Sequence, residues 1–182
     1  MRHIKIILII CLLSHCGSCL GQGLTKQDYK TYSIILDEFL KEDEATKNLI
    51  IIQSESDTIF RGGDSTDQSD IRKLESRMKH RIKFDNDFII KGRKSIVITE
   101  KEFRSLTVDE NRDLIWDPLY KKYPNAEGVI FLSAIHYTSD DKTTGILQIS
   151  LYRNELSGGC FFVKFDLKKK GKKTTRTLTE VA

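Results

Sequence analysis

Residues 128–167, GVIFLSAIHYTSDDKTTGILQISLYRNELSGGCFFVKFDL, decide the fold class of this chain. Runs rich in β-branched and aromatic residues alternate here with short polar turns, a pattern typical of an antiparallel meander. The runs are 129–137, 145–152 and 159–167, and the turns are 139–142 and 155–158. The alternating run at 174–181 predicts a fourth strand, reached through a turn that contains Gly171.

The residues that precede the meander predict a long amphipathic helix. Thr25 and Asp28 have the spacing of a helix N-cap pair. An apolar stripe at helical spacing follows them and consists of Tyr29, Tyr32, Ile35, Leu36, Phe39 and Leu40. Packing against a sheet is the favoured role of this stripe, and a ligand groove is the alternative.

Further helices and strands are expected between residues 49 and 123. The apolar run 49–52 predicts a buried strand, and 96–98 predicts another. Helices are expected at 71–81, after the capping pair Thr99 and Glu102, and over 109–123 with a break at Pro118. We therefore predict an α+β fold with helices packed on one face of a C-terminal antiparallel β-meander.

The first nineteen residues have the layout of a bacterial export signal. A basic start precedes an apolar run at 6–13, and small and cysteine residues follow it. This run has eight residues, against the roughly 20 that span a bilayer, which argues against a permanent transmembrane helix. The expected organisation is an export signal at 1–19, a short linker at 20–24 and a single α+β domain at 25–182.

Two routes of signal processing are compatible with this layout. Cys19 is the candidate for lipidation, because the small residues Gly17 and Ser18 precede it. Cys16, at a place where an aliphatic residue is usual, favours the alternative of an ordinary cleavage that releases a soluble periplasmic or secreted protein. Either route leaves at most Cys19 and Cys160, so the fold must rest on its core without a disulfide framework. Cys160 adjoins Phe161 and is expected to be buried and unreactive.

The positive charge of the chain is concentrated near its C-terminus. The net charge is +4, and six basic residues fall within the nine-residue segment 168–176. They are Lys168, Lys169, Lys170, Lys172, Lys173 and Arg176. The favoured interpretation is a solvated hairpin tip or sheet edge, where lysines discourage aggregation. Contact with an anionic lipid or polysaccharide surface is the alternative. Nucleic-acid binding is disfavoured, because no aromatic residues are interleaved with these charges.

The chain that remains after signal removal has no recognisable catalytic or metal-binding motif. Its two histidines, His80 and His136, are far apart, and it has no cysteine pair of the kind found in zinc sites. Asp64, Asp67 and Asp70 lack the spacing of a calcium loop, and the pairs Asp85/Asp87 and Asp140/Asp141 fit turns better than catalysis. No phosphate loop, nucleophile elbow or nucleotide fingerprint is present. We therefore predict no cofactor, metal or catalytic residue.

Two segments contain distinctive combinations of aromatic, proline and glycine residues. The first is WDPLYKKYP at 116–124, followed by Gly128-Val129-Ile130 and Leu132-Ser133, and the second is GGCFF at 158–162, followed by Lys168. Together they resemble a group of exported proteins common in Bacteroidota. In that group, a Trp and a Tyr-Pro pair precede a G-I-I-x-L-S strand, a hairpin, a Gly-rich turn and a further strand. The Gly-Lys-Trp final strand of the group is not matched, because Lys173 follows Gly171-Lys172. The resemblance implies an exported α+β protein and carries no known activity.

These observations favour a non-enzymatic binding or scaffolding lipoprotein of the periplasm or outer membrane. Its expected partners are the membrane, through the lipid anchor, and an envelope protein or polysaccharide. One alternative is a small periplasmic hydrolase that uses His136 with a carboxylate. A weaker alternative is an inhibitor that presents the turn Ser157-Gly158-Gly159 to a foreign enzyme.

Overall fold

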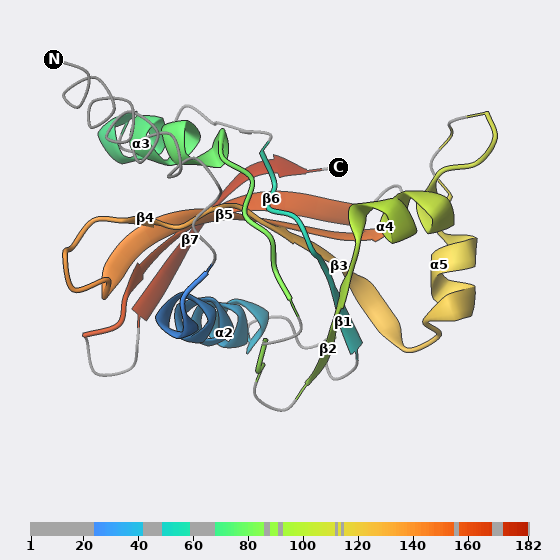
Figure 1. Cartoon of the computed structure of the whole chain (residues 1–182), viewed down its shortest axis with the longest axis horizontal. Helices are drawn as coiled ribbons and strands as arrows, with labels where there is room; N and C mark the ends of the chain where they lie inside the picture. Colours follow the sequence, from blue (N-terminus) through green and yellow to red (C-terminus); the bar gives the residue numbers. More distant parts are fainter. Residues whose placement is uncertain are drawn as a thin grey trace, which may run out of the picture.

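The β-rich runs form strands of a single seven-stranded sheet (Figure 1). The computed structural model describes residues 24–41, 49–58, 68–85, 88–90, 93–111, 113, 115–154, 157–168 and 173–181. The strands are β1 (Leu49–Gln53), β2 (Lys94–Ile98), β3 (Ala126–Leu132), β4 (His136–Tyr137), β5 (Thr144–Asn154), β6 (Ser157–Asp166) and β7 (Lys173–Val181). The helices are α2 (Lys26–Lys41), α3 (Gln68–Met78), α4 (Glu100–Thr107) and α5 (Asp117–Lys122).

The sheet is mixed, with the order β2-β1-β3-β5-β6-β7, and β4 pairs with β5 outside this path. The predicted meander is confirmed, because β3, β5, β6 and β7 pair antiparallel in succession. Strand β1 runs parallel to both β2 and β3. An internal parallel strand is buried on both faces, which explains why β1 is apolar from Leu49 to Ile52 rather than alternating.

The α+β class is confirmed, but helices cover both faces of the sheet. Ile50 and Ile52 pack with α2, whereas Ile51 between them packs with Trp116 and Leu119 at α5. Helix α3 packs on Ile146 and Phe162, whose neighbours Leu147 and Val163 belong to the α2 cluster. Since successive strand residues point to opposite faces, α2 covers one face and α3, α4 and α5 cover the other (Figure 1). The predicted one-face arrangement was wrong because strands that are apolar on both sides need two covers.

Hydrogen-bonded caps explain where α2 and α4 begin, and a proline explains the start of α5. The Thr25 hydroxyl accepts a hydrogen bond from the Asp28 amide at 3.2 Å, and the Asp28 carboxylate accepts one from the Thr25 amide at 2.9 Å. This reciprocal pair is a capping box. Thr99 caps α4 by accepting from the Glu102 amide. The helix predicted over 109–123 begins only at Asp117, because Pro118 fits the first turn of a helix.

We predict that Leu36→Ala lowers the free energy of unfolding by about 2–5 kcal/mol, because the lost contacts leave a cavity in the core. Leu36 lies on the inner face of α2 and is fully buried, whereas Ile89 is 81% exposed. The matched control Ile89→Ala is expected to change stability by no more than about 0.5 kcal/mol. Urea unfolding followed by circular dichroism measures both values. Equal losses in the two variants would contradict the assigned position of α2.

Candidate functional site

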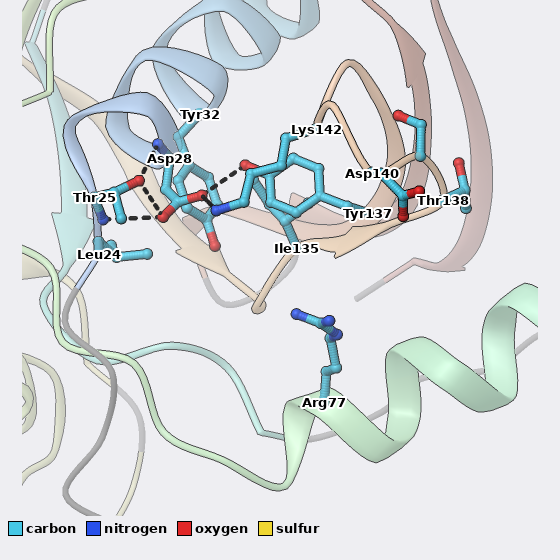
Figure 2. A pocket seen from close by; sticks show the side chains of 11 residues that line it. Leu24, Thr25, Asp28, Tyr32, Arg77, Ile135, Tyr137, Thr138, Asp140 and Lys142 are labelled. Carbon is cyan, nitrogen blue, oxygen red and sulfur yellow. Dashed lines mark hydrogen bonds and ion pairs between the residues drawn. The ribbon is translucent and has the colours of Figure 1, made fainter. Parts of the chain in front are cut away.

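One pocket lies between α2, the end of α3 and the hairpin that joins β4 to β5 (Figure 2). Its volume is about 750 Å³, which is within the range of roughly 300–1,000 Å³ typical of ligand sites. The lining side chains are Leu24, Thr25, Asp28 and Tyr32 from the α2 segment, Arg77 from α3, and Ile135, Tyr137, Thr138, Ser139, Asp140 and Lys142 from the β4–β5 segment.

Asp28 is the centre of the polar wall of this pocket. One carboxylate oxygen accepts hydrogen bonds from the amide and the hydroxyl of Thr25, at 2.9 and 2.6 Å. The other oxygen accepts from the Tyr137 hydroxyl at 2.9 Å and from Lys142 Nζ at 3.3 Å. Burial raises the pKa of Asp28, but these hydrogen bonds outweigh it and bring the pKa below its usual value. Asp28 is therefore held as a charged acceptor whose oxygens already have donors.

Two tyrosines fix this wall to the sheet. The Tyr32 hydroxyl donates to the Ser133 carbonyl at 2.8 Å, and burial raises the pKa of Tyr32 well above its usual value. Burial also raises the pKa of Tyr137, and the negative charge of Asp28 adds to this effect. Both hydroxyls thus remain protonated donors. Lys142 Nζ also lies 5.3 Å from the centre of the Tyr137 ring, within the range of a cation–π contact.

The hairpin turn that carries Lys142 has a defined conformation. Lys142 has a positive φ of 56°, which is uncommon for a residue with a side chain. Asp141 stabilises the turn by accepting hydrogen bonds from the Thr143 amide and hydroxyl. The Lys168 ammonium lies 2.6 Å from Asp141 and, as the main cause, holds the pKa of that carboxyl far below its usual range. The sequence-based assignment of Asp141 to a turn is confirmed.

Arg77 differs from the other charged groups of the pocket. Its side chain projects from α3 toward the Asp28 wall (Figure 2). No hydrogen bond or ion pair joins it to any residue in the described part of the chain. Its positive charge contributes to lowering the pKa of His136. The pocket therefore contains a cation that is not neutralised by a described neighbour.

His136 lies on β4 next to α3. Its Nδ1 atom is buried without a hydrogen-bond partner in the described residues. Burial is the main cause that lowers its pKa, followed by the charge of Arg77. Asp70 opposes this shift electrostatically, but among the described residues no carboxylate accepts a hydrogen bond from the imidazole. The acid–histidine contact that the hydrolase alternative requires is not formed in this part of the structure.

The other residues singled out in the sequence do not come together at one site. Cys160 is buried in β6, as predicted. Lys168 is exposed near the pocket hairpin, and Lys173 and Arg176 belong to the edge strand β7, which pairs with β6. Cys19, Lys169, Lys170 and Lys172 lie outside the described residues, as do Asp64, Asp67 and Asp87, and the side chains of Lys173 and Arg176 are not described. No cluster of three or more metal-ligating side chains occurs among the residues that the structure describes.

Sequence reasoning missed this pocket because each of its residues has an ordinary local role. Asp28 fits a helix cap, Tyr32 an apolar stripe and Lys142 a turn. The available signal was the hydroxyl of Tyr32, since a buried tyrosine needs a hydrogen-bond partner that phenylalanine does not.

Comparisons with protein-family models, with curated proteins and with solved structures found no match for this chain. Among the described helices, none has the length and apolarity needed to cross a bilayer.

We predict that Asp28→Asn destabilises the fold by about 1–3 kcal/mol at pH 7, because the amide replaces a charged acceptor of several hydrogen bonds. A carboxyl with a lowered folded-state pKa stabilises the fold above its unfolded pKa, near 3.8 here, and this contribution is lost as the pH falls through the folded-state value. The difference between variant and wild type should therefore shrink below about pH 4. Denaturant unfolding at a series of pH values measures it.

Asp140→Asn serves as the matched control, because Asp140 lines the same pocket but is exposed. Its stability is expected to stay within about 0.5 kcal/mol of wild type at pH 7. If Asp28→Asn were equally neutral, the hydrogen-bond network would not be the structural centre of the pocket.

Proposed function

We propose that this chain is an exported, non-catalytic binding protein of the cell envelope that binds a small carboxylate-bearing ligand in the pocket between α2 and α3. The observation that carries the proposal is Arg77, an exposed cation that lines a pocket of about 750 Å³ and has no described ionic partner. A guanidinium can hold a carboxylate through two parallel hydrogen bonds. An anionic group on the ligand would supply the partner that the protein itself does not.

The remaining charges of the pocket are compatible with an anion. Asp28 is paired with Lys142 and hydrogen-bonded to Thr25 and Tyr137, so its charge is largely compensated within the wall. Asp140 is exposed, where water and salt weaken its repulsion. Leu24 and Ile135 give the pocket an apolar part that the body of a ligand would contact.

Binding is favoured over catalysis because the polar groups of the pocket are occupied in holding its shape. The Asp28 oxygens and the Tyr32 and Tyr137 hydroxyls are engaged with one another or with the backbone. A general base needs access to the proton that it removes. The small periplasmic hydrolase remains the alternative, and it would need His136 to find an acid that it does not contact among the described residues.

The inhibitor alternative receives less support. Gly158 and Gly159 were expected in a presented turn, but they lie in β6 and pair with Tyr152 and Leu151. A Cβ atom at Gly158 would approach the Leu151 carbonyl oxygen to 2.9 Å, so this glycine serves close packing of the strands. Residues in a sheet ladder are poorly placed to enter the cleft of another protein.

The site of action rests on the first nineteen residues. Their basic, apolar and small segments support export, and Gly17-Ser18-Cys19 supports attachment to the membrane through a lipid on Cys19. A carboxylate-bearing envelope saccharide is a ligand source consistent with this location. The lysine-rich segment 168–176 would add a general attraction for anionic surfaces.

The binding proposal is tested by isothermal titration with glucuronate and with glucose, which differ in the carboxylate. The carboxylates tested are glucuronate, succinate and citrate, and we expect at least one of them to bind. Glucose is expected to bind at least tenfold more weakly than that carboxylate. Arg77→Gln should weaken carboxylate binding by about 10- to 100-fold, the effect of a charged hydrogen-bonding group. The control Lys79→Gln removes one positive charge outside the pocket and should leave affinity unchanged. Equal binding by both variants, or no binding by any carboxylate, would refute the proposal.

Export and anchoring are tested separately by mass spectrometry of the protein purified from the membrane fraction of a bacterial host. We expect the mature chain to begin at Cys19 and to carry the added mass of a lipid. Cys19→Ser should move the protein to the soluble fraction, whereas Cys160→Ser should remain with the membrane. A mature N-terminus at Leu20 or Gln22 would rule out the anchor and leave a soluble exported protein.

A further inference from the structure

A second pocket lies on the opposite face of the sheet from α2, between α4 and the segment that follows α3. It opens where the parallel strands β1 and β2 end, because its lining includes Gln53 at the end of β1 and Glu100 just after β2. Ligands of open sheets commonly bind at the carboxyl ends of parallel strands. The volume is about 340 Å³, enough for one small ring with its substituents.

Gln53 and Asp57, which line this pocket, belong to a strip of four buried polar side chains together with Gln148 and Ser150. Gln53 is 8% exposed and Asp57 is 9% exposed. Asp57 accepts hydrogen bonds from the Gln148 amide at 3.1 Å and from the Ser150 hydroxyl at 3.4 Å, both on β5 and both fully buried. The strip separates the apolar cluster under α3 from the cluster under α4 and α5. Such a gap in an apolar face costs stability and is typical of a functional site.

Gln53 is the member of the strip whose hydrogen bonding is incomplete. It lies two residues after Ile51 and so on the same face of β1, beneath α4. Its side-chain amide lines the pocket, yet it makes no hydrogen bond with any described residue. A carboxamide offers a donor and an acceptor side by side. An amide that no described residue bonds, on a residue that lines a pocket, is available to a ligand or to water.

The walls of the pocket are aromatic. Phe103 of α4 and Phe131 of β3 meet edge to face at 5.3 Å, and Phe131 meets Tyr152 of β5 at 5.8 Å. All three side chains line the pocket beside Gln53. Ring edges and faces at these distances accept a further planar ring. The ligand is thus expected to carry a flat apolar group.

The rim of the pocket disfavours an anion. Arg81 is bonded to Glu55 at 2.6 Å and lies 3.3 Å from Glu100, and Arg104 is paired with Glu100 at 2.9 Å. Both guanidinium groups are therefore already engaged by carboxylates. Asp57 also lines the pocket and is 9% exposed, and a carboxylate brought next to it would be repelled.

We propose that this pocket is a second binding site, which takes a planar aromatic molecule that carries an uncharged or cationic N–H group. The ring lies against Phe103 and Phe131, and the polar edge pairs with the Gln53 amide near Asp57. This site is independent of the carboxylate site proposed above, because it lies on the other face of the sheet and shares no residue with it.

The proposal is tested with benzamide, benzamidine and benzoate, which share a shape and differ in charge. Binding is followed by two-dimensional NMR of the ¹⁵N-labelled full chain, with the Gln53 side-chain amide as reporter. We expect saturable shifts of that amide with benzamide and benzamidine, and at least tenfold weaker binding of benzoate. Gln53→Leu, which keeps the size of the side chain, should weaken benzamide binding by roughly three- to tenfold. Arg77→Gln, in the other pocket, should leave it unchanged.

Other outcomes would overturn the proposal. These are equal binding of benzoate, absence of saturable binding by both N–H compounds, or unchanged benzamide affinity in a folded Gln53→Leu variant. If Gln53→Leu does not fold, Phe103→Leu replaces it, because this change removes the ring but keeps an apolar residue on α4. Unchanged benzamide affinity in that variant would likewise exclude the site.

Discussion

The burial of strand β1 on both faces is the constraint on which the rest of the structure depends. Parallel pairing with β2 and β3 places this apolar strand inside the sheet. Parallel neighbours cannot be joined by tight turns and need long crossovers. The crossovers contain α3 between β1 and β2, and α4 and α5 between β2 and β3. These helices cover one face of the sheet, so the other face of β1 is left to α2.

The two pockets lie beside α2 and beneath α4, the helices that cover the sheet. They differ in which polar group lacks a hydrogen-bonding or ionic partner among the described residues. Beside α2, the carboxylate of Asp28 has all the donors it needs, and the cation of Arg77 has no described partner. Beneath α4, the arginines are engaged by glutamates, and the amide of Gln53 has no described partner. Gln53 is a largely buried residue, whereas Arg77 is exposed and can also be solvated by water. Each group is accessible to a ligand of complementary chemistry, and the two chemistries differ.

The elements of this fold and the antiparallel pairing of its C-terminal strands could be predicted from the sequence, whereas the parallel pairing of β1 with β2 and β3 could not. Alternation in the C-terminal residues predicted the antiparallel strands, and the Thr25 and Thr99 caps predicted the starts of α2 and α4. The apolar run in β1 predicted burial, but no local pattern indicates that β2 and β3 lie on its two sides. The same limit applies to the pockets. Arg77 approaches the Asp28 wall only through packing of α3 on the sheet, which depends on contacts between distant segments.

The hydrogen bonds that Asp28 accepts from Tyr137 and Lys142 also determine which parts of the chain the larger pocket requires. They join residues 109 and 114 positions apart in the chain, and closing loops of this length is entropically costly and slow. During synthesis, α2 emerges first and must wait for the β4–β5 hairpin before its acidic residue gains Tyr137 and Lys142. A shortened chain that lacks the hairpin keeps the hydrogen bonds from Thr25 to Asp28 but loses those from Tyr137 and Lys142. The pocket wall thus requires two segments that lie far apart in the sequence.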